Sequence, residues 1–235
     1  MLRAILFDFN GVLVNDEPLH LALFQRVLGE EGLALGEEDY YRRYIGLDDR
    51  GCFSAVLAQA GERPEPSRVM RLIARKATYY QEVVRHQGYP IFPGAAELVR
   101  AAAEGGMTLG VVSGALRDEV EQALRQTGLR SHFKLLVTAE DVAEGKPDPE
   151  GYRRAMEELN SRPPLPARLF HPHEVLAVED TPPGLAAAAA VGLVTLGVTH
   201  TYPSAALVAA DAVAPRLEGL DLARLQALYA EASRA

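Results

Sequence analysis

Five short apolar runs recur along the chain, and helix-like segments separate the last four of them. The runs are residues 3–9 (RAILFDF), 108–114 (TLGVVSG), 134–139 (KLLVTA), 174–180 (EVLAVED) and 193–198 (LVTLGV). Their length and their continuous apolar character are typical of strands that are buried on both faces of a parallel sheet. The alternation with helices predicts an α/β fold built on a doubly wound parallel sheet.

Four segments around these runs have the pattern of helices: 93–106, 115–129, 149–159 and 183–192. The first opens with a proline and closes at paired glycines, as helices often do. In the second, Leu116, Val120 and Leu124 recur at helical spacing, so we expect them on one buried face.

The segment from residue 16 to residue 88 interrupts this alternation directly after the first apolar run. It has helical periodicity and no convincing strand. We therefore expect a small helical domain of residues 16–88, inserted into an α/β core domain of residues 1–15 and 89–235.

Composition and charge exclude several classes of protein. The formal net charge of −8 argues against a nucleic-acid surface. The single cysteine, Cys52, excludes an internal disulfide and every multi-cysteine zinc site. No run approaches the roughly 18 apolar residues of a membrane-spanning helix, and the N-terminal run is too short and too polar for a signal peptide. We expect a cytoplasmic protein that binds neither nucleic acid nor membrane, whereas its oligomeric state is not predicted.

Chemically capable side chains follow the predicted strands at their carboxyl ends, where open parallel sheets bind ligands. These residues are Asp8 and Asn10 after the first run, Ser113 and Gly114 after the second, Lys146 in the loop after the third, and Glu179 and Asp180 at the end of the fourth. The sequence therefore predicts that acids, a hydroxyl and a cation converge on one site.

The same stretches resemble the four motifs of the haloacid dehalogenase superfamily. They are FDFNGVLVNDE (7–17), VVSG (111–114), EGKPDP (144–149) with Tyr152, and VEDTPPG (178–184). Their order and spacing, with a helical insert after the first motif, resemble the capped subgroup that contains β-phosphoglucomutase and many phosphatases. The resemblance implies a Rossmann-like core with a cap domain, a Mg²⁺ cofactor and hydrolysis of a small phosphorylated metabolite.

The resemblance also implies a role for each residue. Asp8 would attack phosphorus and form an aspartyl-phosphate, and Lys146 would neutralise the shared negative charge. Mg²⁺ would be held by Asp8, by the backbone carbonyl of Asn10 and by Asp180, with Glu179 acting through water.

Phosphate oxygens would be held by Ser113 and by the backbone around Gly114 and Ala115. Taken singly, each of these site residues has a plainer interpretation: a turn cap, a helix N-cap, an acid pair near a helix start or a solvated lysine. It is their joint occurrence that favours the catalytic interpretation.

Asn10 departs from the family pattern, in which a second aspartate usually serves as general acid and base. An amide cannot exchange a proton near neutral pH, and loss of acid–base help costs about a hundred- to ten-thousand-fold in rate. Three explanations stay open. The enzyme uses substrates with good leaving groups or takes a proton carrier such as His20 from the cap; it is a slow enzyme that mainly binds phosphorylated ligands; or the Asn10–Gly11 dipeptide deamidates to aspartate.

The predicted cap gives weaker indications of specificity. His20 and Lys76 are tentative ligand-binding residues there, although a lysine in this position is more often solvent-facing. In the run GLDDR (46–50), Asp48 and Asp49 stand where related mutases carry a serine and a phosphate-gripping arginine, and Arg50, which could compensate, is displaced by one residue. A sugar-phosphate mutase is therefore disfavoured, and a dehalogenase is disfavoured because Asn10 replaces the usual aromatic residue and the Glu179–Asp180 pair indicates magnesium.

Overall fold

The computed structural model describes residues 1–45, 47 and 49–233, which divide into two compact units. The core unit comprises Met1–Asn15 and Tyr89–Ala235, and the helical unit comprises Asp16–Gly88. Gly46 and Asp48, part of the GLDDR run, lie outside the described residues.

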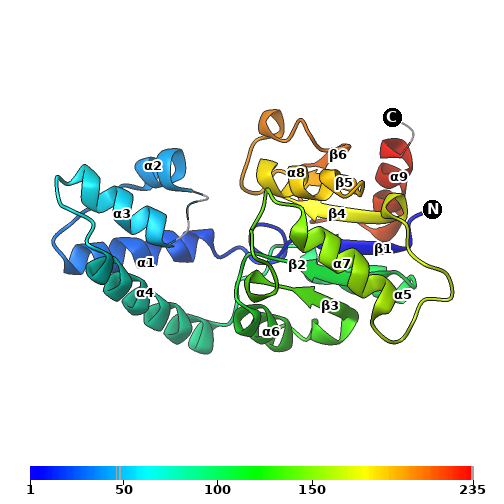
Figure 1. Cartoon of the computed structure of the whole chain (residues 1–235), viewed down its shortest axis with the longest axis horizontal. Coiled ribbons are helices and arrows are strands. Elements are labelled where there is room, and N and C mark those ends of the chain that lie inside the picture. Colours follow the sequence, from blue (N-terminus) through cyan, green and yellow to red (C-terminus); the bar gives the residue numbers. More distant parts are fainter. Residues whose placement is uncertain (46, 48, 234–235) are drawn as a thin grey trace. The chain divides into compact units, whose positions relative to one another are not determined.

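A six-stranded parallel sheet forms the centre of the core unit (Figure 1). Its strands, in chain order, are β1 (Ala4–Phe7), β2 (Thr108–Val112), β3 (Phe133–Val137), β4 (Val175–Glu179), β5 (Val194–Val198) and β6 (Ala212–Ala214). The spatial order is β3-β2-β1-β4-β5-β6, and every neighbouring pair is parallel. The order reverses beside β1, which is where doubly wound sheets bind their ligands. The predicted doubly wound α/β fold is confirmed.

Helices cover both faces of this sheet. They are α5 (Ala95–Glu104), α6 (Arg117–Gln126), α7 (Glu150–Ser161), α8 (Pro182–Ala190) and α9 (Leu222–Ala232), with 3₁₀ turns η2 (Arg130–His132), η3 (Ala139–Asp141), η4 (Pro172–Glu174) and η5 (Ser204–Ala206). Helices α7 and α8 lie in front of the sheet in Figure 1 and share one apolar core with β1, β2, β3 and β4. Within that core, Tyr152 of α7 is fully buried.

The prediction that Leu116 is buried is wrong. Leu116 lies at the N-cap of α6 in an extended conformation and is 58% exposed. Because the helix begins only at Arg117, Leu116 does not take the helical register of Val120 and Leu124, which are both buried.

The helical unit consists of α1 (Glu17–Glu30), α2 (Glu37–Asp39), the π-helix η1 (Tyr40–Tyr44), α3 (Asp49–Gln59) and α4 (Pro66–Gln87). Proline in the first turn of α1 and of α4 is compatible with a helix start, because the amides there have no partner within the helix. The unit has its own apolar core, in which Phe24 and Phe53 meet edge to face at 5.0 Å.

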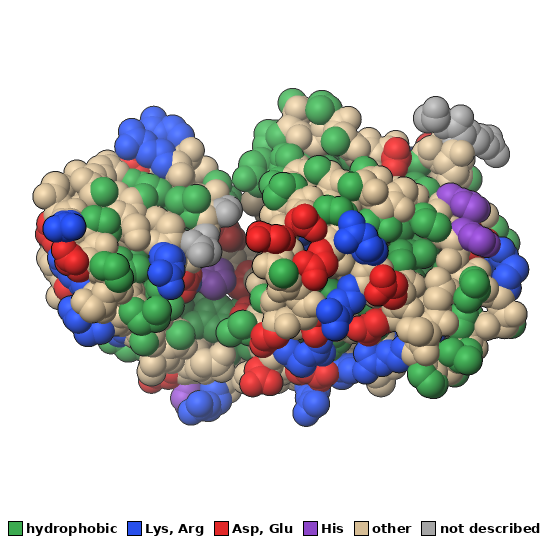
Figure 2. All heavy atoms as spheres, viewed as in Figure 1, with side chains coloured by type: hydrophobic (Ala, Val, Ile, Leu, Met, Phe, Trp, Pro, Cys, Tyr) green, Lys and Arg blue, Asp and Glu red, His purple; other side chains and the backbone are tan. Residues whose placement is uncertain are grey.

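The surface is mixed in charge. Figure 2 shows acidic and basic side chains interspersed on the visible face of the core unit, which fits the net negative charge. Among the described residues, no helix combines the length and the apolar character needed to cross a bilayer.

Candidate active site

Lys146 links two buried carboxylates at the carboxyl edge of the sheet. Its Nζ lies 2.7 Å from Oδ1 of Asp8, which follows β1, and 2.6 Å from Oε1 of Glu179, which ends β4. Nζ also donates to the carbonyl of Val112 at 3.0 Å. Burial disfavours the charged ammonium, but Asp8 and Glu179 outweigh it and raise the pKa of Lys146. The lysine therefore remains a cation in this site.

Glu179 is fully buried and engaged by two donors. Besides Lys146, the phenolic hydroxyl of Tyr152 donates to its Oε1 at 2.5 Å. Burial raises the pKa of Glu179 to about 7; Lys146 opposes this shift, and the charge of Asp8 adds to it. Gly184 makes the close approach of α8 possible, since a Cβ there would lie 2.0 Å from Oε2 of Glu179.

The carboxylate cluster fits a hard divalent cation. Asp8, Glu179 and Asp180 each offer an oxygen within 4.8 Å of the others, and all three are buried. Oε2 of Glu179 and Oδ1 of Asp180 have no hydrogen-bond partner among the described residues. Burial and the nearby Asp8 raise the pKa of Asp180. Two unsatisfied buried oxygens beside a third carboxylate are costly unless a cation compensates them, and oxygen ligands of this kind suit Mg²⁺.

The turn after Asp8 brings the backbone of Asn10 and Gly11 to the same cluster. Gly11 has a φ of +77°, and a Cβ on it would lie 2.0 Å from Oδ2 of Asp180. Its amide donates to the carbonyl of Val14 at 2.9 Å. Deamidation of Asn10 requires attack by this same nitrogen, so the hydrogen bond to Val14 opposes the third explanation.

Ser113 stands directly after Val112, the residue whose carbonyl Lys146 contacts. It is buried, and its Oγ accepts a hydrogen bond from the amide of Ala115 at 2.9 Å. Gly114 between them is exposed. The expected phosphate-holding turn is thus adjacent to the lysine, but the Ala115 amide already has a partner within the turn.

His20 and Lys76 meet within the helical unit rather than facing solvent. Lys76 is 2% exposed, and its Nζ lies 2.5 Å from Oδ1 of Asp49 and 2.8 Å from Nδ1 of His20. Because an ammonium only donates, Nδ1 of His20 accepts, and its Nε2 donates to Asp16 at 3.1 Å. The plainer alternative, a solvent-facing lysine, does not hold for Lys76, and both nitrogens of His20 are engaged inside the unit.

The motifs do not include one further residue at the site, His200. It lies in the turn after β5, and its Nδ1 contacts the carbonyl of Gly11. It stands in no recognisable motif, so the only signal available was its place after the fifth apolar run, at the same edge of the sheet as the other site residues.

A doubly wound parallel sheet with buried carboxylates and a lysine at the switch point defines a Rossmann-like α/β protein suited to a cation and an anionic ligand. The family model described as haloacid dehalogenase-like hydrolase matches residues 5–198. The chain belongs to this family, as its motifs had suggested, and is accordingly an enzyme of the hydrolytic class.

Similar proteins extend over nearly the whole chain. Validoxylamine A 7′-phosphate phosphatase from Streptomyces hygroscopicus subsp. limoneus is 31% identical over 218 residues, covering 90% of this chain and 92% of that protein. A phosphorylated carbohydrates phosphatase from Thermotoga maritima is 29% identical over 217 residues, covering 91% and 93% respectively.

Solved structures agree with this assignment. CbbY from Rhodobacter sphaeroides, solved in complex with phosphate, has a TM-score of 0.79 at 26% identity and covers 96% of this chain and 100% of its own. A mutant of the same protein was solved in complex with xylulose 1,5-bisphosphate. β-Phosphoglucomutase from Clostridium difficile shares the fold, with a TM-score of 0.78 at 19% identity and 98% coverage of both chains.

Proposed function

We propose that the protein is a Mg²⁺-dependent phosphohydrolase of a small phosphorylated metabolite, and that it acts through an aspartyl-phosphate on Asp8. The observation that carries this proposal is the contact of Lys146 with both Asp8 and Glu179, beside the unpaired oxygen of Asp180. The names of similar proteins, which are phosphatases of phosphorylated small molecules, support the same substrate class.

In this proposal, Asp8, Asp180 and the backbone carbonyl of Asn10 hold the ion, with Glu179 behind them. A bound Mg²⁺ would offset the charge of the carboxylates and of the phosphate oxygens. The remaining chemistry belongs to the side chains of the chain itself.

Asp8 is the nucleophile. Lys146 contacts its Oδ1, which leaves the second carboxylate oxygen to attack phosphorus while the bond from phosphorus to the leaving oxygen breaks. A water molecule then attacks the phosphorus of the aspartyl-phosphate, which releases phosphate and restores Asp8. In both steps, Lys146 compensates the negative charge on the oxygens of the transferring phosphoryl group.

Asn10 restricts which leaving groups are practical. Its amide can donate a hydrogen bond to the leaving oxygen but cannot transfer a proton. His20 is poorly suited to replace it, because Lys76 and Asp16 occupy both ring nitrogens. Substrates that leave without protonation, such as acyl phosphates, therefore suit this chain better than alkyl phosphates.

Asn10 also favours a second candidate function, a catalytically weak protein that binds phosphorylated ligands. Such a protein would keep the metal site, since the backbone carbonyl at position 10 does not depend on the side chain. A mutase has less support because of the cap run GLDDR (46–50), and a dehalogenase has less support because of Asn10.

The test is hydrolysis of p-nitrophenyl phosphate and acetyl phosphate by the wild type, Asp8→Asn and Asn10→Asp, with Mg²⁺ or EDTA. Mg²⁺-dependent turnover by the wild type that Asp8→Asn abolishes supports the enzyme. A nearly inert wild type with a large gain in kcat for Asn10→Asp supports the binder. Turnover that survives both EDTA and Asp8→Asn refutes both.

A further inference from the structure

His200, in the turn that follows β5, contacts the turn that carries Asn10. Its Nδ1 lies 2.8 Å from the carbonyl oxygen of Gly11. A carbonyl oxygen can only accept, so Nδ1 is the protonated ring nitrogen. The two residues are 189 positions apart, and the hydrogen bond therefore ties the segment after β5 to the segment after β1.

The imidazole ring is fixed by a second contact. It stacks on Phe92 with a centroid separation of 3.9 Å and an interplanar angle of 13°. Phe92 in turn donates its backbone amide to the carbonyl of Leu13 at 3.0 Å. The His200 ring, Phe92 and the turn that carries Gly11 are therefore linked by contacts, and these contacts fix the direction in which Nδ1 points. Burial lowers the pKa of His200, which favours the neutral ring.

We infer that His200 is a positioning residue for the divalent cation site, an inference that rests on the proposed metal-dependent function. His200 holds the backbone of the Asn10–Gly11 turn, whose carbonyl at position 10 is one ligand of the proposed set. It acts on a ligand of the ion rather than on the ion or the substrate, and partners of this kind typically change metal affinity about ten- to a hundred-fold.

Paired substitutions separate the hydrogen bonds from the packing. His200→Phe keeps a ring against Phe92 but has no donor, whereas His200→Asn keeps a donor close to the position of Nδ1 and loses the ring. His173→Phe, at an exposed histidine of the same unit, is the matched control.

The readout is the Mg²⁺ concentration that gives half of the maximal thermal shift, together with kcat on acetyl phosphate at saturating Mg²⁺. We expect His200→Phe to raise this concentration about ten- to a hundred-fold. Its melting temperature without Mg²⁺ should stay near that of the wild type, and most of kcat should return at saturation by mass action. His200→Asn and His173→Phe should resemble the wild type.

Two results would overturn the inference, and they differ from each other. If the wild type responds to Mg²⁺ and His200→Phe responds at the same concentration, the positioning role is wrong while the metal site stands. If the wild type shows no Mg²⁺-dependent shift, the metal site itself is wrong, and the positioning role falls with it.

Discussion

Gly11 approaches Asp180 so closely that a methyl group on its Cα would lie 2.0 Å from the carboxylate oxygen Oδ2. Replacement of Gly11 by alanine therefore forces Asp180 to move, in addition to the strain of a φ of +77°. We expect Gly11→Ala to lose the Mg²⁺-dependent rise in melting temperature and most of the phosphatase activity. Thermal melts with and without Mg²⁺ measure the first, and hydrolysis of acetyl phosphate measures the second.

Gly106→Ala is a matched control for backbone strain. Gly106 also has a φ of +77°, but no heavy atom lies near the position of an added Cβ. Both variants should lose roughly 1–2 kcal/mol to the left-handed conformation, and only Gly11→Ala should lose the response to Mg²⁺. An equal loss of that response in both variants would show that strain, rather than the displacement of Asp180, is responsible.

Replacement of Lys146 by methionine removes a positive charge that contacts both Asp8 and Glu179. We expect kcat to fall about a hundred- to a thousand-fold, as for other electrostatic groups at reacting centres. The measurement is steady-state hydrolysis of acetyl phosphate at saturating Mg²⁺.

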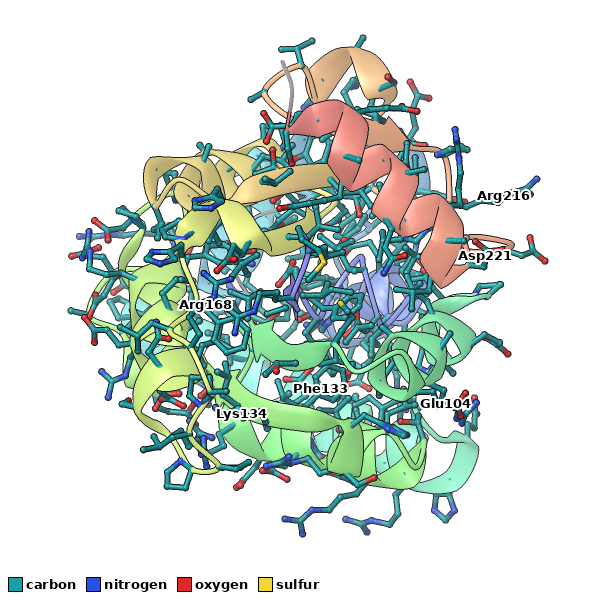
Figure 3. All side chains as sticks on the ribbon, turned by 90° about the vertical axis from the view of Figure 1, so that its right-hand side faces the viewer. Glu104, Phe133, Lys134, Arg168, Arg216 and Asp221 are labelled. Atoms are coloured by element: carbon teal, nitrogen blue, oxygen red, sulfur yellow. The ribbon has the colours of Figure 1, made fainter. Side chains whose placement is uncertain are left out.

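Lys134→Met makes the same chemical change at the other end of the sheet. Lys134, labelled in Figure 3, lies near the start of β3 and donates to the carbonyls of Leu159 and Pro164 at 2.9 and 3.0 Å. Its replacement should change stability but not kcat. Retention of full activity by Lys146→Met would remove the lysine from the proposed mechanism.

The sequence predicted local features of this molecule better than contacts between residues that are far apart along the chain. The strands were found because continuous apolar runs report burial on both faces locally, whereas β6 is only three residues long, Ala212–Ala214, and gives too little signal. Leu116 was misplaced because helical spacing does not reveal where a helix begins.

Pairings between distant residues were not visible in the sequence. Lys76 was a tentative ligand-binding residue, and its burial depends on Asp49, which is 27 positions away. The contact of His200 with Gly11 spans 189 positions and involves a backbone acceptor, for which no side-chain pattern exists. The motifs located Asp8, Glu179 and Asp180 because they directly follow or end a predicted strand. They located Lys146 in the loop that follows the third predicted strand.

We expect the contribution of Glu174 to the stability of the core unit to depend on pH. Burial opposes its ionisation, but Arg168, the His171 amide and Arg3 donate hydrogen bonds that outweigh burial and lower the pKa of Glu174 to about 2. A depressed pKa stabilises the folded state at pH values above the unfolded pKa of about 4.3, and this stabilisation disappears as the pH falls through the folded value. Replacement by glutamine should therefore lower the melting temperature at pH 7.

The difference between wild type and Glu174→Gln should shrink steadily from about pH 5 towards pH 2, since both side chains are then neutral. Glu218→Gln is the control, because the pair of Glu218 with Arg216 is largely exposed at 3.5 Å and such pairs contribute little. Figure 3 labels Arg168 and Arg216. A difference that does not vary with pH would mean that the glutamate contributes through shape rather than charge.

Substitutions of the paired residues Lys76 and Asp49 in the helical unit should have non-additive effects on stability. Asp49→Asn leaves the ammonium of Lys76 without its carboxylate, and because Asp49 is itself one-third exposed, we expect a loss of about 2 kcal/mol, below the range for fully buried pairs. Adding Lys76→Met should recover much of this loss, since methionine suits the contact with the Phe24 ring, over which Nζ lies at 4.2 Å. Urea unfolding of the full chain measures both variants, with Glu38→Gln as the control for an exposed pair with Arg42. If the double variant is as unstable as Asp49→Asn alone, an unpaired buried ammonium is not the cause of the loss.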